Sequence, residues 1–106
     1  MITNEEIKEI ANIIYHDYEP DKIILFGSYA IGNATESSDL DILVISDKEK
    51  EKPRWKRGLS LLYKLRKYHF SKDLLFYSKE EIENWKEVDS AFITKITKSG
   101  IVLYER

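Results

Sequence analysis

Apolar side chains recur along this chain with two different periods, and each period predicts a different kind of element. Over residues 4–18 they recur every three or four positions, as one face of a helix requires. The members of this set are Ile7, Ile10, Ala11, Ile14 and Tyr18. Thr3 and Glu6 have the spacing of a capping box at its start. The pattern therefore predicts a helix from about Asn4 to Tyr18, ended by Pro20.

Short apolar runs predict four strands. Lys22–Phe26 is almost continuously apolar, which is typical of a strand that is buried on both faces. Asp39–Ser46 and Lys72–Tyr77 each place an Asp at the beginning of an apolar run, and Ile101–Tyr104 is the last such run. Because each run is bounded by turn-forming or charged residues, we expect strands rather than buried helix segments.

Further helices are expected between these strands. Tyr29–Ile31 predicts a short helix that Gly32 stops, and 54–69 predicts a long one. The apolar face expected for the long helix comprises Trp55, Leu59, Leu62, Tyr63 and Arg66, widened by Leu61, Leu65 and Tyr68. The charged segment 47–53 before it is expected to be a mobile linker.

The C-terminal third contains two more helix signals. Ser78 and Glu81 form a second capping box, which opens a helix through Trp85. Trp85 and Ile82 are expected to belong to the core. Asp89 or Ser90 is expected to cap a last helix, which ends at Gly100.

Length and composition favour one α/β domain over residues 1–106. The chain is 42% hydrophobic and contains no cysteine, which excludes a disulfide scaffold and a thiol nucleophile. No apolar run approaches the length of a membrane span, and the start shows no signal-peptide pattern. We therefore expect a cytoplasmic protein.

Charge is distributed unevenly along the chain. The overall formal charge is −2, so nothing global favours binding to nucleic acid. The segment 48–72, however, contains ten Lys or Arg and only two acidic residues, a net charge of about +8. It is interpreted either as a solvated helix face or as a basic surface for nucleotide phosphates or an acidic partner.

The candidate chemistry lies between the first two predicted strands. Gly27 and Ser28 follow the first strand, and Asp39 and Asp41 begin the second. Residues two apart in a strand share a face, so these carboxylates could hold one divalent ion or two. If a helix begins after Ser28, its free N–H groups favour a phosphate. This combination is what phosphoryl or nucleotidyl transfer needs.

These residues resemble a known family. Gly27-Ser28, ten residues, then Asp39-x-Asp41 is similar to the signature of the DNA polymerase beta-type nucleotidyltransferases. The match is closest to the minimal nucleotidyltransferases, the MntA-like antitoxins of HEPN/MNT toxin–antitoxin systems. The resemblance implies an α/β nucleotidyltransferase (polymerase beta-like) fold: a small mixed sheet, helices mainly on one side, and a metal cleft at the strand starts. Many relatives carry Arg where this chain has Ile31.

The resemblance also implies an activity and its residues. AMP would pass from ATP to a hydroxyl, with Gly27 and Ser28 on the phosphates. Asp39 and Asp41 would hold two Mg²⁺ ions, and Asp73 would complete the catalytic metal site and activate the acceptor. The implied acceptor is a tyrosine of a partner HEPN-domain toxin, which the transfer would silence.

Two alternatives stay open at this stage. One is an antitoxin of weak or lost activity that neutralises its partner by binding. The other is a small-molecule nucleotidyltransferase of the aminoglycoside-modifying type, whose acceptor site another chain would have to complete.

Overall fold

Two helices of this protein begin at capping boxes that the local sequence predicts. In the computed structural model, which describes residues 1–88 and 91–106, helix α1 spans Asn4–Tyr18. Its N-cap Thr3 accepts the Glu6 amide N–H, while the Glu6 carboxylate accepts the N–H of Thr3. Ser78 and Glu81 repeat this arrangement at the start of α4 (Lys79–Trp85). Both predicted capping boxes are confirmed.

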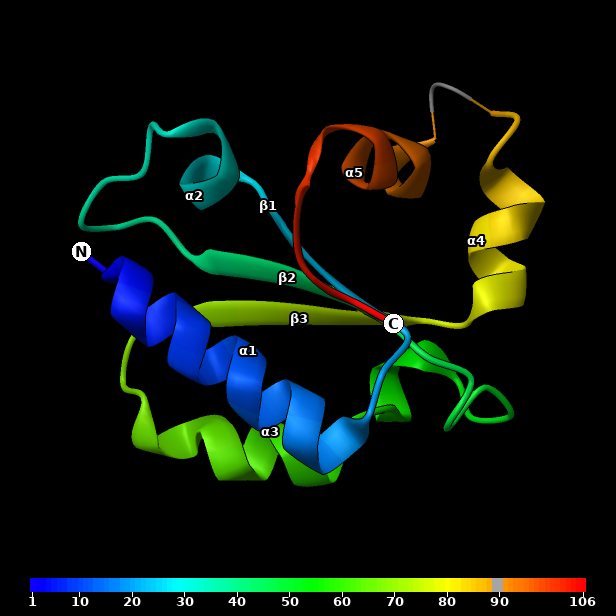
Figure 1. The fold of residues 1–106 in the computed structure, drawn as a ribbon, viewed down its shortest axis with the longest axis horizontal. Helices are drawn as coiled ribbons and strands as arrows, with labels where there is room; N and C mark the ends of the chain where they lie inside the picture. Colours follow the sequence, from blue (N-terminus) through cyan, green and yellow to red (C-terminus); the bar gives the residue numbers. More distant parts are fainter. Residues whose placement is uncertain (89–90) are drawn as a thin grey trace.

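The four predicted strands form one mixed sheet in the order β3-β2-β1-β4. Their bounds are β1 Lys22–Phe26, β2 Leu40–Ile45, β3 Lys72–Tyr77 and β4 Ile101–Glu105. The central strand β1 pairs antiparallel with β2 and β4, and β2 pairs parallel with β3. β3 is therefore an edge strand, and it starts at the same end of the sheet as β2 (Figure 1).

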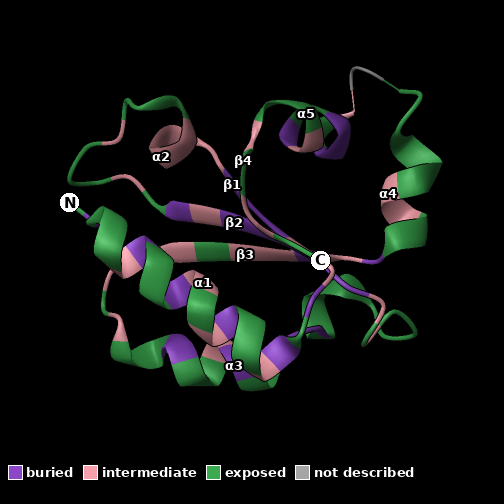
Figure 2. Ribbon diagram, in the orientation of Figure 1, coloured by how far each residue is buried: buried purple, intermediate pink, exposed green. Residues whose placement is uncertain are grey.

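Helices cover both faces of the sheet, and the expectation of helices mainly on one side was wrong. α1 and α3 (Leu59–Lys64) lie on one face, whereas α5 (Phe92–Ser99) lies on the other (Figure 1). The short helix α2 (Ser28–Ile31) follows β1, and its Tyr29 and Ala30 pack against the core on the α1 side. Each face has its own core: Ile10, Ile14, Ile42 and Leu65 pack on the first, and Ile24, Leu43, Ile93 and Ile96 on the second. Buried positions therefore lie on both sides of the central strands (Figure 2).

The predicted long helix over 54–69 is broken. The segment forms a 3-10 turn at Arg54–Lys56, then α3, then a second 3-10 turn at Leu65–Lys67. Gly58 adopts φ 71°, and an added Cβ would lie 2.2 Å from the Phe76 ring. Of the predicted apolar face, Leu61 and Leu65 are buried, whereas Trp55, Leu59 and Tyr63 are exposed.

The segment 47–53 is anchored rather than free. The Arg57 guanidinium is 4% exposed and donates to the carbonyls of Glu49, Lys50 and Lys52. It also pairs with Glu81 at 2.7 Å. The predicted mobile linker is therefore held by a single buried cation.

Near the C-terminus, the last helix begins after Ala91 and ends at the predicted Gly100. Asp89 and Ser90, which the sequence suggested as capping residues, lie outside the described residues. Trp85 is 48% exposed, so its predicted place in the core was wrong. No helix within 1–88 or 91–106 is long and apolar enough to cross a membrane.

Candidate active site

The parallel pairing of β2 and β3 brings two of the predicted carboxylates side by side. Asp41 and Asp73 are direct register partners, so their side chains leave the same face of adjacent strands. Adjacent strands lie about 4.8 Å apart. The Leu40 N–H donates to the Ser71 carbonyl at 3.0 Å, which fixes the two strand starts relative to each other. Asp41 and Asp73, which lie in separate segments of the sequence, are therefore neighbours on adjacent strands.

Asp39 precedes β2 and lies two residues before Asp41, on the same side of the chain. Asp39 and Asp73 are exposed, and Asp41 is partly buried. Burial, then the charges of Asp73 and Asp39, raise the pKa of Asp41 above its ordinary value. The cause is plain in the geometry: three like charges converge, and the middle one is the least hydrated.

The Gly27-Ser28 turn lies next to the carboxylate cluster. Phe26 is the register partner of Asp41, so the turn after β1 lies beside the start of β2. Gly27 adopts φ 73° and ψ −155°, and an added Cβ would lie 2.2 Å from Asp41 Oδ2. Only glycine allows the backbone to approach the carboxylate this closely. Ser28 then begins α2, and the Gly27 carbonyl accepts the Ala30 and Ile31 amides.

The donor set of this site suits a hard divalent cation. It offers carboxylate oxygens and no sulfur, and Mg²⁺ in phosphoryl-transfer sites takes one or two carboxylates together with water and substrate phosphates. Within the described residues, no group of three His, Asp or Glu side chains is already arranged around a metal position. Two carboxylates completed by substrate oxygens do not require such a group. The raised pKa of Asp41 shows that a cation here would relieve an existing repulsion.

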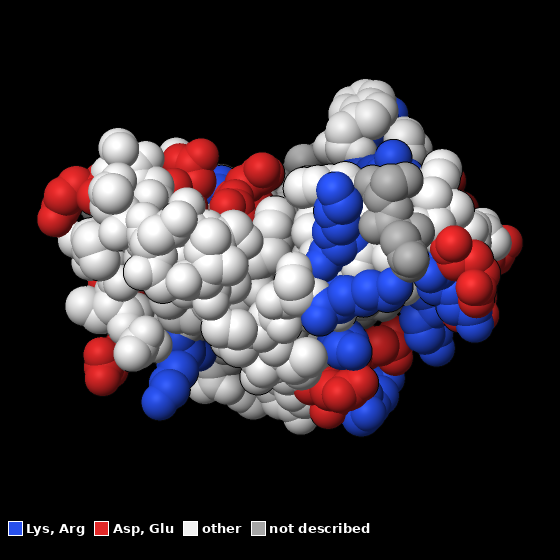
Figure 3. Space-filling view, turned by 90° about the horizontal axis from the view of Figure 1, so that it is seen from above, with Lys and Arg blue, Asp and Glu red and all other residues white. Residues whose placement is uncertain are grey.

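Few cations offset this cluster from within the protein. Figure 3 views the molecule from above Figure 1, and Lys and Arg gather on its right half, whereas Asp and Glu predominate among the charges on its left. The strands β2 and β3 start at the left in this orientation. No ion pair of the described residues involves Asp39, Asp41 or Asp73.

A groove of about 420 Å³ opens beside Asp39. Its walls include Tyr29, Phe70, Ser38 and Ser71. The Tyr29 hydroxyl accepts the Ile2 N–H at 3.1 Å, which joins the residue after Ser28 to the start of the chain. Sequence reasoning missed Tyr29 and Phe70 as site residues, because nothing in their local pattern distinguishes a groove wall from an ordinary core position.

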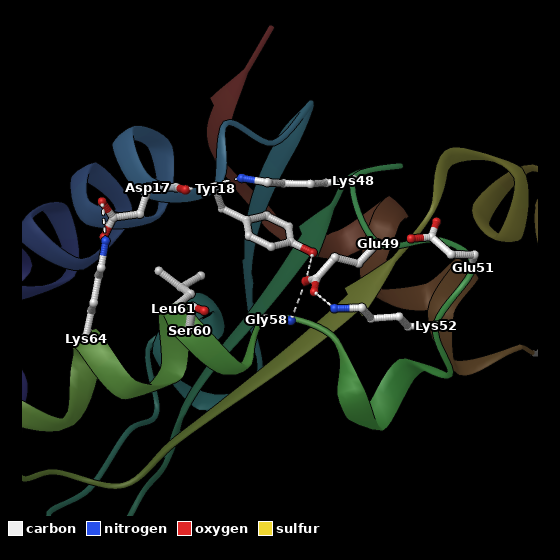
Figure 4. A pocket seen from close by; sticks show the side chains of 10 residues that line it. All are labelled: Asp17, Tyr18, Lys48, Glu49, Glu51, Lys52, Gly58, Ser60, Leu61 and Lys64. Atoms are coloured by element: carbon white, nitrogen blue, oxygen red, sulfur yellow. Dashed lines mark hydrogen bonds and ion pairs between the residues drawn. The ribbon is translucent and has the colours of Figure 1, made fainter.

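Another pocket, of about 270 Å³, lies at the opposite end of β2 and is separate from the carboxylates (Figure 4). Glu49 occupies its centre and accepts the Tyr18 hydroxyl, the Gly58 N–H and Lys52 Nζ. Burial alone would raise the pKa of Glu49, but these donors lower it to about 2. Its polar groups are satisfied internally, so this pocket supports the structure of the loop rather than a reaction.

Comparison with known proteins extends the likeness over nearly the whole chain. Residues 8–106 match the family model described as "Polymerase beta, Nucleotidyltransferase". One Methanocaldococcus jannaschii protein named "Putative protein adenylyltransferase" is 39% identical over 95% of this chain and 99% of its own length. A second protein of the same name and organism is 31% identical over 94% and 93%.

A solved structure supports the fold. The crystal structure of a "putative nucleotidyltransferase" from Sulfolobus solfataricus aligns with a TM-score of 0.63 and 21% identity. The alignment covers 94% of this chain and 78% of that one. At this identity the likeness establishes the shared fold alone.

Proposed function

We propose that this chain, which belongs to the polymerase beta nucleotidyltransferase family and is a nucleotidyltransferase enzyme, transfers AMP from ATP to a hydroxyl of a partner protein. The finer claims are the donor, the acceptor and the residues. The observation that carries them is the contact of the Gly27 turn with Asp41, whose register partner is Asp73. The turn proposed to bind phosphate and the carboxylate cluster therefore lie against each other at one end of the sheet.

Each residue has a role that follows from its position. Asp39 and Asp41 would hold Mg²⁺, with Asp73 completing the catalytic position. Bound there, the two ions supply charge neutralisation for the triphosphate and the developing phosphoryl charge. Gly27 leaves room for the β- and γ-phosphates beside the backbone, and Ser28 offers its hydroxyl and the first N–H of α2.

The transfer step balances without a covalent enzyme intermediate. The acceptor hydroxyl oxygen forms a bond to the α-phosphorus of ATP, and the bond from that phosphorus to the bridging oxygen breaks. Pyrophosphate leaves with the electron pair. The hydroxyl proton passes to Asp73, which is exposed and at the edge of the sheet, where an acceptor can approach.

The acceptor we propose is a tyrosine of a HEPN-domain toxin, which AMP would inactivate. The names of the relatives support a protein acceptor. The resemblance of Gly27-Ser28 and Asp39-x-Asp41 to the minimal nucleotidyltransferases supports the HEPN partner. On this proposal the chain is the antitoxin of a cytoplasmic toxin–antitoxin pair, and it touches no nucleic acid directly.

A second candidate is neutralisation by contact, and Ile31 favours it. This residue is 70% exposed on α2, beside the phosphate turn, where many family members carry Arg. An exposed apolar side chain there suits a protein contact better than a phosphate contact.

If a HEPN-domain protein is encoded beside this chain, the test is its mass spectrometry after incubation with the chain, ATP and Mg²⁺. We expect a mass gain of one or more AMP units, lost with Asp41→Asn. The matched control is Asp47→Asn, at the opposite end of the same strand, where an amide oxygen can still accept the Lys79 N–H. This control should keep full transfer.

Other outcomes would reject the proposal in different ways. A stable complex without any mass gain would favour neutralisation by contact. AMP transfer to an aminoglycoside without any protein partner would instead favour the small-molecule activity.

A further inference from the structure

Three large apolar side chains that the fold does not use lie within nine residues of each other. Trp55 is 75% exposed, Leu59 59% and Tyr63 66%. Leu59 and Tyr63 are four residues apart on α3 and so project from one face of that helix. Leu61 of α3 and Leu65 directly after it already belong to the core. Exposed apolar side chains that cluster in this way mark an interaction site.

Cations lie against the aromatic rings of this segment. Lys56 Nζ is 5.1 Å from the Trp55 ring centroid, and Arg66 Cζ is 4.3 Å from that of Tyr63. Lys67 likewise lies 5.5 Å from the Tyr68 ring. We call the set Trp55, Lys56, Leu59, Tyr63, Arg66 and Lys67 the α3 surface.

The α3 surface lacks the acidic residues that an ordinary solvated face contains. No Asp or Glu occurs between Lys52 and Lys72. Lys52 and Lys64 find carboxylates elsewhere, in Glu49 and Asp17. Lys56, Arg66 and Lys67 have no carboxylate within ion-pair distance in the part of the chain described. Their charge is therefore available to an acidic partner.

The place of the α3 surface in the fold relates it to the carboxylates. α3 packs on the face of the sheet opposite α5 (Figure 1). The chain then leads from Lys67 into β3, which is the edge strand and carries Asp73 as its second residue. A protein bound to the α3 surface could reach Asp73 by passing a segment around this open edge.

We infer that the α3 surface docks the acceptor protein, through a patch of that protein that is apolar at its centre and acidic at its rim. This inference rests on the proposed transfer to a protein. Aromatic residues and Arg are enriched in protein interfaces, and Leu59 gives nothing to a phosphate backbone.

The experiment measures complex formation separately from transfer. The probe is the HEPN-domain protein of the proposed transfer, titrated without ATP into an Asp41→Asn protein. Adding Trp85→Phe makes Trp55 the single tryptophan, so that its fluorescence reports on the α3 surface. The variants are Arg66→Glu and the pair Leu59→Ser, Tyr63→Ser. The matched control is Lys8→Glu, an exposed cation on α1.

We expect the partner to shift the Trp55 fluorescence. Arg66→Glu and the paired variant should each weaken the complex at least tenfold, and Arg66→Lys should restore most of the loss. Lys8→Glu should bind as the parent does. In the catalytically intact protein, the same variants should raise the KM for the acceptor and leave the Kd for ATP unchanged. Thermal melting of each variant separates lost binding from lost folding.

Several results would overturn the inference. Equal binding by all variants would do so, as would AMP transfer with an unchanged KM in Arg66→Glu; the transferase proposal would survive both. Binding of a dT20 oligonucleotide or of phosphatidylserine vesicles, lost in Arg66→Glu, would reassign the surface to nucleic acid or membrane. Self-association abolished by the paired variant would reassign it to a second copy. Conversely, a complex that the variants weaken, but that never gains AMP, would retain the docking surface and reject the transfer.

Discussion

The two ends of the parallel strands β2 and β3 differ in whether their charged side chains are paired. At their starts, Asp39, Asp41 and Asp73 converge, and the pKa of Asp41 rises because it is partly buried among like charges. Beyond their far ends, Arg57 pairs with Glu81. The hydrogen bond from Arg57 lowers the pKa of Glu81 to about 2, against an opposing effect of burial.

The difference separates a structural site from a functional one. The Arg57 end satisfies its charges within the chain, and its cation fastens a loop to a strand. At the Asp41 end, none of the three carboxylates forms an ion pair within the described residues. Charge repulsion that a fold retains is a reason to expect a ligand of opposite sign.

Removing the cation should disrupt the paired end most strongly. We expect Arg57→Met to lower the free energy of unfolding by about 3 kcal/mol, because Glu81 and several carbonyls lose their donor. Arg54→Met is the control. Arg54 also pairs with Glu81, but it is exposed and its ion pair is longer, 3.9 Å against 2.7 Å for Arg57. It should cost less than about 0.5 kcal/mol. Urea unfolding of both variants measures the contrast, and equal losses would contradict it.

At the carboxylate end, we expect the largest loss of AMP transfer from adding a single methyl group at Gly27. In Gly27→Ala the new Cβ would displace the Asp41 carboxylate, so AMP transfer should fall by about a hundredfold or more. Gly32→Ala is the control: Gly32 also has a positive φ, 84° against 73°, but its ψ is 17° rather than −155°, and its Cβ would meet nothing within 4 Å. A steady-state assay of both variants compares a positive-φ glycine that lies against Asp41 with one that has open space around it. Similar losses in the two would disprove the role of the close approach.

Much of this contrast could be predicted from the sequence, because its signals are local. Gly27, Asp39 and Asp41 lie within 15 positions, and the strands around them were set by apolar runs. Asp73 was harder, because it lies 32 positions after Asp41 and their pairing depends on the crossover between β2 and β3. The resemblance provided that link, and the parallel register now gives its physical basis.

The predictions that were wrong depended on contacts between residues far apart in the sequence. A helical period over 54–69 concealed the turn at Gly58, which the Phe76 ring makes obligatory from 18 residues away. Arg57 looked like one more basic residue, because its partner Glu81 is 24 positions distant. The apolar run Lys22–Phe26 was interpreted as buried on both faces, and that interpretation already required helices on both sides.

Low pH should reduce the stability that Glu49 and Glu81 provide at the paired end, and this effect should be smaller than that of Arg57→Met. Glu49 and Glu81 have pKa values of about 2 in the folded protein, below their ordinary value. The unfolded chain therefore binds more protons between about pH 4.5 and pH 2, so stability falls as the pH is lowered through that window. Each residue should contribute on the order of 2 kcal/mol. Urea unfolding at several pH values should show the slope, and Glu81→Gln should flatten it. The exposed neighbour variant Glu80→Gln should leave the slope as it is.

The smallest effect tests the unsatisfied end directly and needs no acceptor. Asp41→Asn removes one of three converging charges, so it should raise the free energy of unfolding, by less than about 1 kcal/mol because the site is partly hydrated. Mg²⁺ at ten times its Kd should stabilise the native protein by about 1.4 kcal/mol and the variant much less. Differential scanning calorimetry with and without Mg²⁺ gives both numbers. If Asp41→Asn destabilises the protein, or if Mg²⁺ shifts both melting temperatures equally, the carboxylates are not held in mutual repulsion for a cation, and the contrast between the two strand ends loses its functional meaning.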